Sequence, residues 1–342
     1  MAMDRLDNDF ATHWNELRAD LEAGLPELTL SLFRELPAAQ ATAIALLIEN
    51  GKKLRASLLL AVCEALGGSA AQALPSAAVI ECVHAASLIH DDLVDGDRTR
   101  RDRPATWVVH GSRRAVLLAD VMFATALHRS AELGKQEMIA VSHAIAMLAL
   151  GAYEEQFDSH ELEARGASRA TQRARYDRVI RLKTGSLFAA AAELGALAAG
   201  ASPTLCRAAS EFGVRIGEAY QIADDLHDVL SAPRGESILQ DRCGSQASFL
   251  ATFDETPERW TEIHRAGAQL PDHFRFDAEH AAAAMEKEIE RRIQLARDAL
   301  APLPAGPQLA FLHWAPCAIV DPILVAAAGA RSAELAIGSS AR

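Results

Sequence analysis

The chain has 342 residues, a formal charge of −12 from 34 basic and 46 acidic side chains, and a hydrophobic content of 50%. This acidic balance argues against nonspecific binding to nucleic acid, because that affinity comes from neutralising phosphates with Lys and Arg. Aromatic residues make up only 5% and alternating Val, Ile and Thr are scarce, which argues against a β-sheet protein.

Long Ala- and Leu-rich segments with helical periodicity follow one another from about residue 10 to residue 330. No Gly/Ser-rich or Pro-rich linker divides them, and the expected helices are separated only by short stretches at 66–68, 96–104, 164–170, 199–203, 231–237 and 302–307. We therefore expect an all-α protein with one domain over residues 1–330 and a frayed or disordered tail at 331–342.

The N-terminal segment MAMDRLDNDF is acidic and lacks the apolar stretch of a signal peptide. Asp120 and Glu193 interrupt the longest apolar runs before they reach membrane-spanning length. The five cysteines are odd in number and show no CxxC spacing, which fits reduced thiols. These features predict a soluble, cytoplasmic protein without stable membrane insertion.

The segment NGKKLRASLLL, residues 50–60, places three cations directly after Gly51 at an expected helix start: Lys52, Lys53 and Arg55. Backbone N–H groups at a helix N-terminus favour anions, and so do basic side chains. By itself the segment could equally be a solvated basic turn, so it indicates a candidate anion site.

The next acidic feature is LIHDDLVDGDRTRRDRP, residues 88–104, which begins as an apolar helix. Asp91 and Asp95 are spaced i, i+4 and share a helix face, while Asp92 lies about 100° round from Asp91. Like charges at this spacing repel unless a cation lies between them, so the cluster indicates hard metal ions bound through oxygen. The alternative is a solvated acidic helix end.

Basic residues flank this cluster on both sides. His84 lies seven residues before the first aspartate, close to the same helix face, where a core histidine is the alternative interpretation. Arg100 and Arg101 follow the cluster, and ion pairs with Asp97 or Asp102 would be their ordinary role.

A second acidic cluster occurs in AYQIADDLHDVL, residues 219–230, with Asp224, Asp225 and Asp228 at the end of another apolar helix. Mg²⁺ keeps several waters and is typically held by one or two carboxylates together with substrate phosphates. Two acidic clusters that face each other could therefore grip a diphosphate through bridging metal ions.

Four segments in this order, GKKLRA, HAASLIHDDLVD with RR downstream, RLKTGSLF and YQIADDLHD, resemble the trans-type polyprenyl (isoprenyl) diphosphate synthase family. The resemblance covers roughly residues 45–250. It implies that Mg²⁺ and the allylic diphosphate are held by Asp91, Asp92, Asp95, Asp224, Asp225 and Asp228. It implies that isopentenyl diphosphate contacts Lys52, Arg55, His84 and Arg101. It also implies that the allylic diphosphate contacts Arg100 and Lys183, and that the reacting carbons are lined by Thr184 and Gln221.

By the same resemblance, the fold is a single-domain helical bundle of the isoprenoid synthase type with a central apolar cavity, and the protein forms a homodimer. The implied reaction joins isopentenyl diphosphate to an allylic donor such as dimethylallyl, geranyl or farnesyl diphosphate. Three Mg²⁺ ions are expected with the donor, and Mn²⁺ is the alternative metal. Loss of the donor's diphosphate would give an allylic cation, so the cavity must exclude water.

Two positions depart from the family pattern. Asp102 stands where the family's RRG has glycine, and Gln246 in CGSQASF stands near a position where the family has lysine. The second change would remove a cation from the allylic site. The allylic diphosphate could then be bound less tightly, or the natural donor could be unusual.

Three other functions stay open on the sequence alone: a diverged prenyltransferase with another acceptor, a class I terpene cyclase, and a non-catalytic partner subunit. For the elongating enzyme, the small residues Ala86 and Ser87 lie one turn before the first aspartate, so a growing chain could pass them. This predicts a product of C20 or longer, unless Met122 or Phe123 forms the floor of the tunnel.

Overall fold

The computed structural model describes residues 2–49, 51–164, 168–231, 253 and 278–340. Most of this part is helical, which confirms the all-α prediction. The helices are α1 (Ala2–Leu32), α2 (Ala38–Glu49), α3 (Leu54–Ala65), α4 (Ala70–Val94), α5 (Thr106–His110), α6 (Ser112–Leu133), α7 (Lys135–Ala164), α8 (Arg169–Ile180), the π-helical turn η1 (Arg181–Gly185), α9 (Ser186–Ala198), α10 (Pro203–Ser231), α14 (Ala278–Ala299) and α15 (Pro307–Ser340). Two short strands, β1 (Thr99–Arg100) and β2 (Arg103–Pro104), form an antiparallel hairpin.

Local sequence signals account for several helix starts. The Gln72 side chain accepts a hydrogen bond from the Ser69 backbone N–H at 2.9 Å, which caps α4. Ser168 caps α8 by accepting a hydrogen bond from the backbone N–H of Thr171 at 3.2 Å. Pro203 opens α10, at a position where its missing N–H costs nothing.

The chain divides into two compact units, each described by itself. Unit 1 comprises residues 1–148, 186–214 and 296–315, and unit 2 comprises residues 149–185, 215–295 and 316–342. The sequence-based assignment of residues 1–330 to one domain stays a prediction. Helix α15 continues to Ser340 and so enters the segment 331–342 that the sequence predicts to be a tail.

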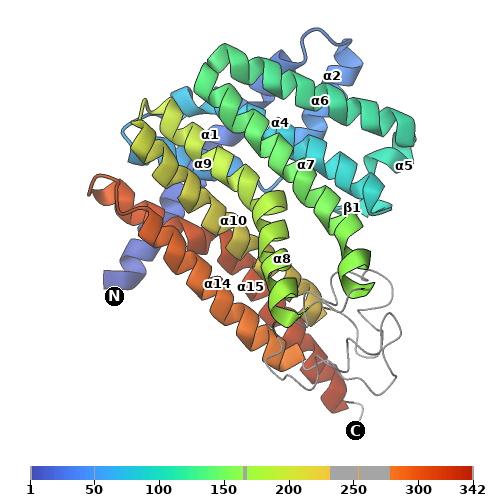
Figure 1. The fold of residues 1–342 in the computed structure, drawn as a ribbon. Coiled ribbons are helices and arrows are strands. Elements are labelled where there is room, and N and C mark those ends of the chain that lie inside the picture. Colours follow the sequence, from blue (N-terminus) through green and yellow to red (C-terminus); the bar gives the residue numbers. More distant parts are fainter. Residues whose placement is uncertain (1, 50, 165–167, 232–252, 254–277, 341–342) are drawn as a thin grey trace. The chain divides into compact units, whose positions relative to one another are not determined.

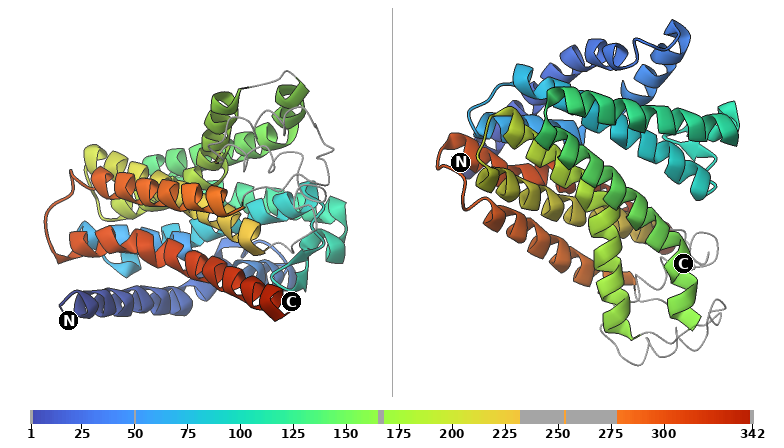
Figure 2. Two further views of the ribbon diagram at one scale, coloured as in Figure 1. Left: turned by 90° about the horizontal axis from the view of Figure 1, so that it is seen from below. Right: turned by 45° about the horizontal axis from the view of Figure 1, so that its top comes forward.

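The core of unit 1 is built around α4, which packs against α1, α3, α6 and α9. Helices α4 and α6 lie side by side (Figures 1 and 2). Helix α9 lies directly on α3, because a Cβ at Gly195 would come within 2.3 Å of the Leu59 carbonyl oxygen. Leu58, Leu59 and Leu60 are fully buried there, and each contributes about 1.5–3 kcal/mol relative to exposure.

Unit 2 contains a cluster of ion pairs that joins α8, α10 and α14. The buried guanidinium of Arg292 on α14 donates to Glu218 of α10 at 2.6 Å, to Asp177 of α8 at 2.7 Å and to Glu288 of its own helix at 2.6 Å. Glu218 also accepts a hydrogen bond from Arg215 at 3.0 Å. This cluster fixes α8 against α10 close to the second acidic motif.

Within the described ranges, two helices are long and apolar enough to cross a membrane by length and composition alone: α4, and residues 307–329 of α15. Of the most apolar window, 72% is buried in α4 and 39% in α15. Core helices of soluble proteins pass the same test, and α4 is the central helix of unit 1.

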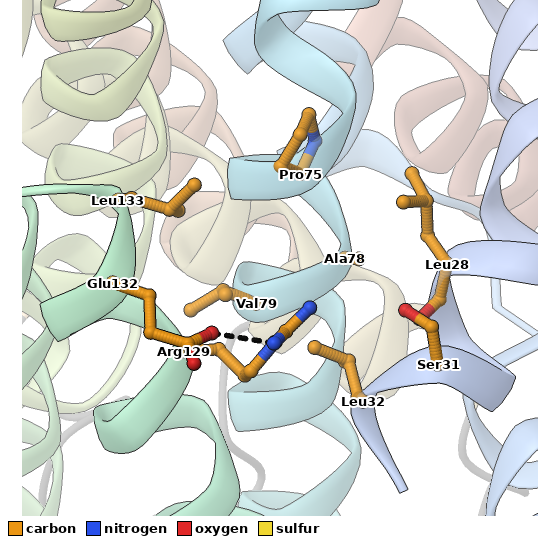
Figure 3. Close-up of a pocket in the computed structure, with 9 residues that line it drawn as sticks. All are labelled: Leu28, Ser31, Leu32, Pro75, Ala78, Val79, Arg129, Glu132 and Leu133. Carbon is orange, nitrogen blue, oxygen red and sulfur yellow. Dashed lines mark hydrogen bonds and ion pairs between the residues drawn. The ribbon is translucent and has the colours of Figure 1, made fainter. Parts of the chain in front are cut away.

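A small pocket in unit 1 opens between α1, α4 and α6 and has a volume of about 80 Å³ (Figure 3). Its lining comprises Leu28, Ser31, Leu32, Pro75, Ala78, Val79, Arg129, Glu132 and Leu133. None of the predicted site residues belongs to this set, and sites for drug-sized ligands are typically about 300–1,000 Å³. The central apolar cavity therefore stays a prediction.

Candidate active site

The first acidic motif lies at the C-terminal end of α4, as its sequence predicts. Asp95 is the residue after the last helical position, and its N–H bonds the Asp91 carbonyl at 2.8 Å. Asp91 is half-buried and Asp95 is exposed. Asp92 is buried, and it accepts a hydrogen bond from Arg100 Nε at 2.7 Å. Burial raises the pKa of Asp92, and the Arg100 hydrogen bond opposes that rise.

Arg100 reaches Asp92 because it lies on the β1–β2 hairpin. The two residues at the hairpin tip, Arg101 and Asp102, have φ angles of 51° and 59°. A two-residue hairpin turn with positive φ at both positions is the arrangement that favours Asn-Gly or Asp-Gly. A glycine at position 102 would suit this backbone, and aspartate is one of the few other residues that tolerates it.

Trp107 on α5 supports the base of the hairpin. Its indole N–H donates to the Asp97 carbonyl at 2.7 Å, and the Arg98 guanidinium lies 5.5 Å from the centre of its ring. The Ala105 N–H bonds the Arg98 carbonyl at 2.9 Å. No sequence motif indicated this support, although Trp107 is an aromatic residue shortly after the RR pair.

The predicted cations of α3 meet the histidine of α4 in unit 1. Arg55 Nη1 lies 3.2 Å from His84 Nε2, and its guanidinium stacks 4.5 Å from the centre of the Phe188 ring. Burial, followed by the charge of Arg55, lowers the pKa of His84 well below its ordinary value of 6.5. His84 is therefore neutral near pH 7 and accepts the hydrogen bond from Arg55.

Lys52 is exposed at the same turn, whereas the next residue, Lys53, is buried. Lys53 has a φ of 55°, bonds the Ile48 carbonyl, and lies 3.8 Å from the carboxylate of buried Glu81. Glu81 also accepts a hydrogen bond from the Ala56 N–H at 3.2 Å. No sequence motif indicated a role for Glu81. Its buried carboxylate holds the basic turn in place through Lys53 and the Ala56 N–H.

Arg101 belongs to the same neighbourhood. A Cβ built on Gly51 would lie 3.7 Å from Arg101 Nη1 and 3.5 Å from Lys53 Nζ. Four residues predicted to contact isopentenyl diphosphate, namely Lys52, Arg55, His84 and Arg101, thus lie around the start of α3 and the adjacent hairpin.

In unit 2, a chain of hydrogen bonds ends at the second acidic motif. Thr184 donates to the Gln221 side chain at 2.7 Å, and Gln221 donates to Asp225 Oδ1 at 3.0 Å. The other Asp225 oxygen accepts a hydrogen bond from Tyr176 at 2.6 Å. Burial raises the pKa of Asp225 to about 7, against the lowering effect of these two hydrogen bonds. Asp224 and Asp228 are exposed.

Tyr176 is a third residue of the candidate site, after Trp107 and Glu81, that no sequence motif indicated. It is buried, and the centre of its ring lies 5.5 Å from that of Phe253, with the two rings nearly perpendicular. It precedes Asp225 by 49 residues, so no local pattern could pair them.

Lys183 lies in the π-helical turn η1, and its ammonium group donates to Glu155 of α7 at 2.5 Å. A π-helical turn is uncommon and often occurs at functional sites. Thr184 follows Lys183 in the same turn, so η1 places a cation and a hydroxyl side by side.

The carboxylates fit Mg²⁺ in their chemistry, because it prefers hard oxygen donors. Asp95, Asp224 and Asp228 are exposed and Asp91 is half-buried, and Asp92 and Asp225 accept hydrogen bonds from Arg100 and Tyr176. Among the residues with described positions, no group of three or more His, Cys, Asp and Glu side chains could hold a metal ion by itself.

The two motifs lie in different units, so a joint site formed by both stays a prediction. Residues 1–148 of unit 1 contain Asp91, Asp92 and Asp95, and residues 215–295 of unit 2 contain Asp224, Asp225 and Asp228. Gln246, the suggested replacement for a family lysine, lies outside the described residues.

Comparison with known proteins gives consistent matches. The family of polyprenyl synthetases matches residues 38–258. A short chain isoprenyl diphosphate synthase of Methanothermobacter thermautotrophicus is 38% identical over 197 residues, which are 54% of this chain and 57% of that protein. A geranylgeranyl diphosphate synthase of Mycobacterium tuberculosis is 32% identical over 287 residues, which are 78% of this chain and 80% of that protein. The chain thus spans less than two thirds of the first relative's length.

A solved decaprenyl diphosphate synthase of Rhodobacter capsulatus is 29% identical, with a TM-score of 0.71 over 93% of this chain and 99% of that one. A polyprenyl synthase of Caulobacter crescentus, solved with calcium and isoprenyl diphosphate, is 26% identical, with a TM-score of 0.71 over 90% of this chain and 95% of that one. Since the family match covers more than half of the sequence and includes both acidic motifs, the chain belongs to the polyprenyl synthetase family.

Proposed function

We propose that the chain is a prenyltransferase that condenses isopentenyl diphosphate with an allylic diphosphate, head to tail, to give a polyprenyl diphosphate of C20 or longer. One observation carries this proposal. In unit 1, Arg55, neutral His84 and Arg101 gather at the start of α3, and the same α4 that carries His84 ends in the first acidic motif. This arrangement supports an anion site about two turns of α4 before a site for a metal-bound diphosphate.

The basic residues of the chain would bind the two diphosphates, and uncharged polar residues would face the reacting carbons. Arg55 and Arg101, with Lys52, would hold the diphosphate of isopentenyl diphosphate through charge-assisted hydrogen bonds. His84 accepts from Arg55 and so fixes the direction in which that guanidinium points. Lys183 and Arg100 would contact the allylic diphosphate, while Thr184 and Gln221 would face the reacting carbons.

The six aspartates of the two motifs would hold Mg²⁺, which supplies electrostatic stabilisation of the departing diphosphate: Asp91, Asp92, Asp95, Asp224, Asp225 and Asp228. The hydrogen bonds from Arg100 to Asp92 and from Tyr176 and Gln221 to Asp225 would orient these two carboxylates. Three ions with the allylic donor, and Mn²⁺ as a substitute, belong to this proposal.

The proposal also includes a cytoplasmic homodimer without stable membrane insertion. Helix α6 supports self-association, because it exposes an apolar face: Leu117 is 64% exposed, and Val116 and Val121 are 36% and 39% exposed. Exposed apolar faces of this kind are typical of protein interfaces.

The test is incubation with Mg²⁺, isopentenyl diphosphate and each of dimethylallyl, geranyl and farnesyl diphosphate, followed by measurement of product chain length. Incorporation of isopentenyl carbon into products of C20 or longer is expected. Consumption of the donor without that incorporation would favour a cyclase or another acceptor. Absence of turnover with every donor would favour a non-catalytic partner subunit.

A further inference from the structure

Lys183 is the cation that the proposed function assigns to the allylic diphosphate. In the structure its ammonium group forms an ion pair with the carboxylate of Glu155. Its Nζ lies 2.5 Å from Glu155 Oε2, and the two side chains are 24% and 21% exposed. The pair is therefore partly withdrawn from water, where charge attraction is stronger than on an open surface. Sequence motifs gave no hint of it, because Glu155 lies 28 residues before Lys183.

The backbone is arranged to bring these two side chains together. A Cβ at Gly151 would lie 2.7 Å from the Lys183 backbone nitrogen and 2.9 Å from Leu182 Cβ, so only glycine allows α7 to approach η1 this closely. Glu155 follows Gly151 by four residues and shares its helix face. The close approach therefore directs Glu155 toward the π-helical turn that carries Lys183.

We propose that Glu155 is a competing counter-ion, which an allylic diphosphate must displace from Lys183 in order to bind. This inference rests on the proposed function, because it takes the ligand of Lys183 to be a diphosphate. Glu155 competes for the ammonium hydrogens and also repels the incoming anion. The penalty applies equally to any diphosphate, so removal of Glu155 should tighten inorganic diphosphate and geranyl diphosphate by the same factor.

Unit 2 supplies a matched control on the same helix. Glu154 precedes Glu155, but its carboxylate pairs with Arg178 through two hydrogen bonds of 2.7 Å. Glu154→Gln therefore removes one negative charge from the neighbouring position without touching the Lys183 pair. A comparison of the two variants separates local competition from a general change in charge.

The experiment is calorimetric titration of inorganic diphosphate, and separately of geranyl diphosphate, into the whole protein with Mg²⁺ and no isopentenyl diphosphate. Glu155→Gln should lower the Kd for inorganic diphosphate about five-fold, as expected for removal of a partly buried competing pair. Glu154→Gln should change it much less. In a Lys183→Met background the gain from Glu155→Gln should shrink, because the contested ammonium is gone.

An unchanged or higher Kd in Glu155→Gln would overturn the inference, and so would equal gains in both glutamate variants. Thermal unfolding of each variant checks that the fold is retained. If diphosphate binds and Glu155→Gln tightens it while no donor is ever elongated, the proposed function fails and the inference stands. If the wild-type protein binds neither diphosphate, both fail.

Discussion

Arg292→Met tests whether the buried ion cluster of unit 2 stabilises the fold. The change removes the guanidinium that donates to Glu218, Asp177 and Glu288. Glu218 is 1% exposed and would be left as a buried anion. Breaking one side of a buried ion pair costs about 3–5 kcal/mol. Glu218 keeps Arg215 at 3.0 Å, so we expect the lower end, about 3 kcal/mol of unfolding free energy.

Arg291→Met is the matched control for this prediction. Arg291 is the preceding residue and also pairs with Glu288, at 2.8 and 2.7 Å, but its side chain is 54% exposed. Exposed pairs contribute about 0.2–1 kcal/mol, so this variant should lose no more than that. The assay is urea unfolding followed by circular dichroism, with the midpoint and the slope fitted for each variant.

The two variants should therefore differ by roughly 2 kcal/mol or more in unfolding free energy. Equal losses would refute the reasoning, because burial of the cluster would then contribute nothing. Asp177 adjoins Tyr176, which donates to Asp225, so Arg292→Met should also lower kcat more than Arg291→Met does.

Further outcomes are expected at the candidate site. Tyr176→Phe removes a hydrogen bond to the half-buried Asp225 carboxylate, of a kind worth about 1.5–3 kcal/mol. It should lower kcat with little effect on the KM for isopentenyl diphosphate; a change in that KM alone would contradict the assignment. Asp102→Ala should lower the free energy of unfolding by about 1–2 kcal/mol because of its left-handed backbone, whereas Asp102→Gly should not, as urea unfolding of both would show. Because the pKa of His84 is lowered in the folded state, only the unfolded chain gains this proton as pH falls below 6.5, so the free energy of unfolding should decrease there. His84→Gln should flatten that part of the curve of unfolding free energy against pH. Ala86→Phe should shorten the product if the growing chain passes this face of α4, and product-length analysis that gives identical products at retained activity would place the tunnel elsewhere.

Much of the fold and part of the site could be predicted from the sequence, because their causes are local. Helical periodicity gave the all-α class, and the first acidic motif falls at the end of α4, where its break in periodicity placed it. The family pattern also identified Arg55 and His84 as partners in function. It could not reveal that they touch, since that contact joins residues 29 apart through the packing of α3 on α4.

Tertiary structure decided which side chains donate hydrogen bonds to two of the predicted carboxylates. Arg100 from the hairpin donates to Asp92, and Tyr176 from α8 donates to Asp225. It also placed Glu155 on Lys183. A motif fixes the type and spacing of side chains along one helix, but the partner of each charge depends on which other helix is packed against it, and that is set by burial over the whole unit.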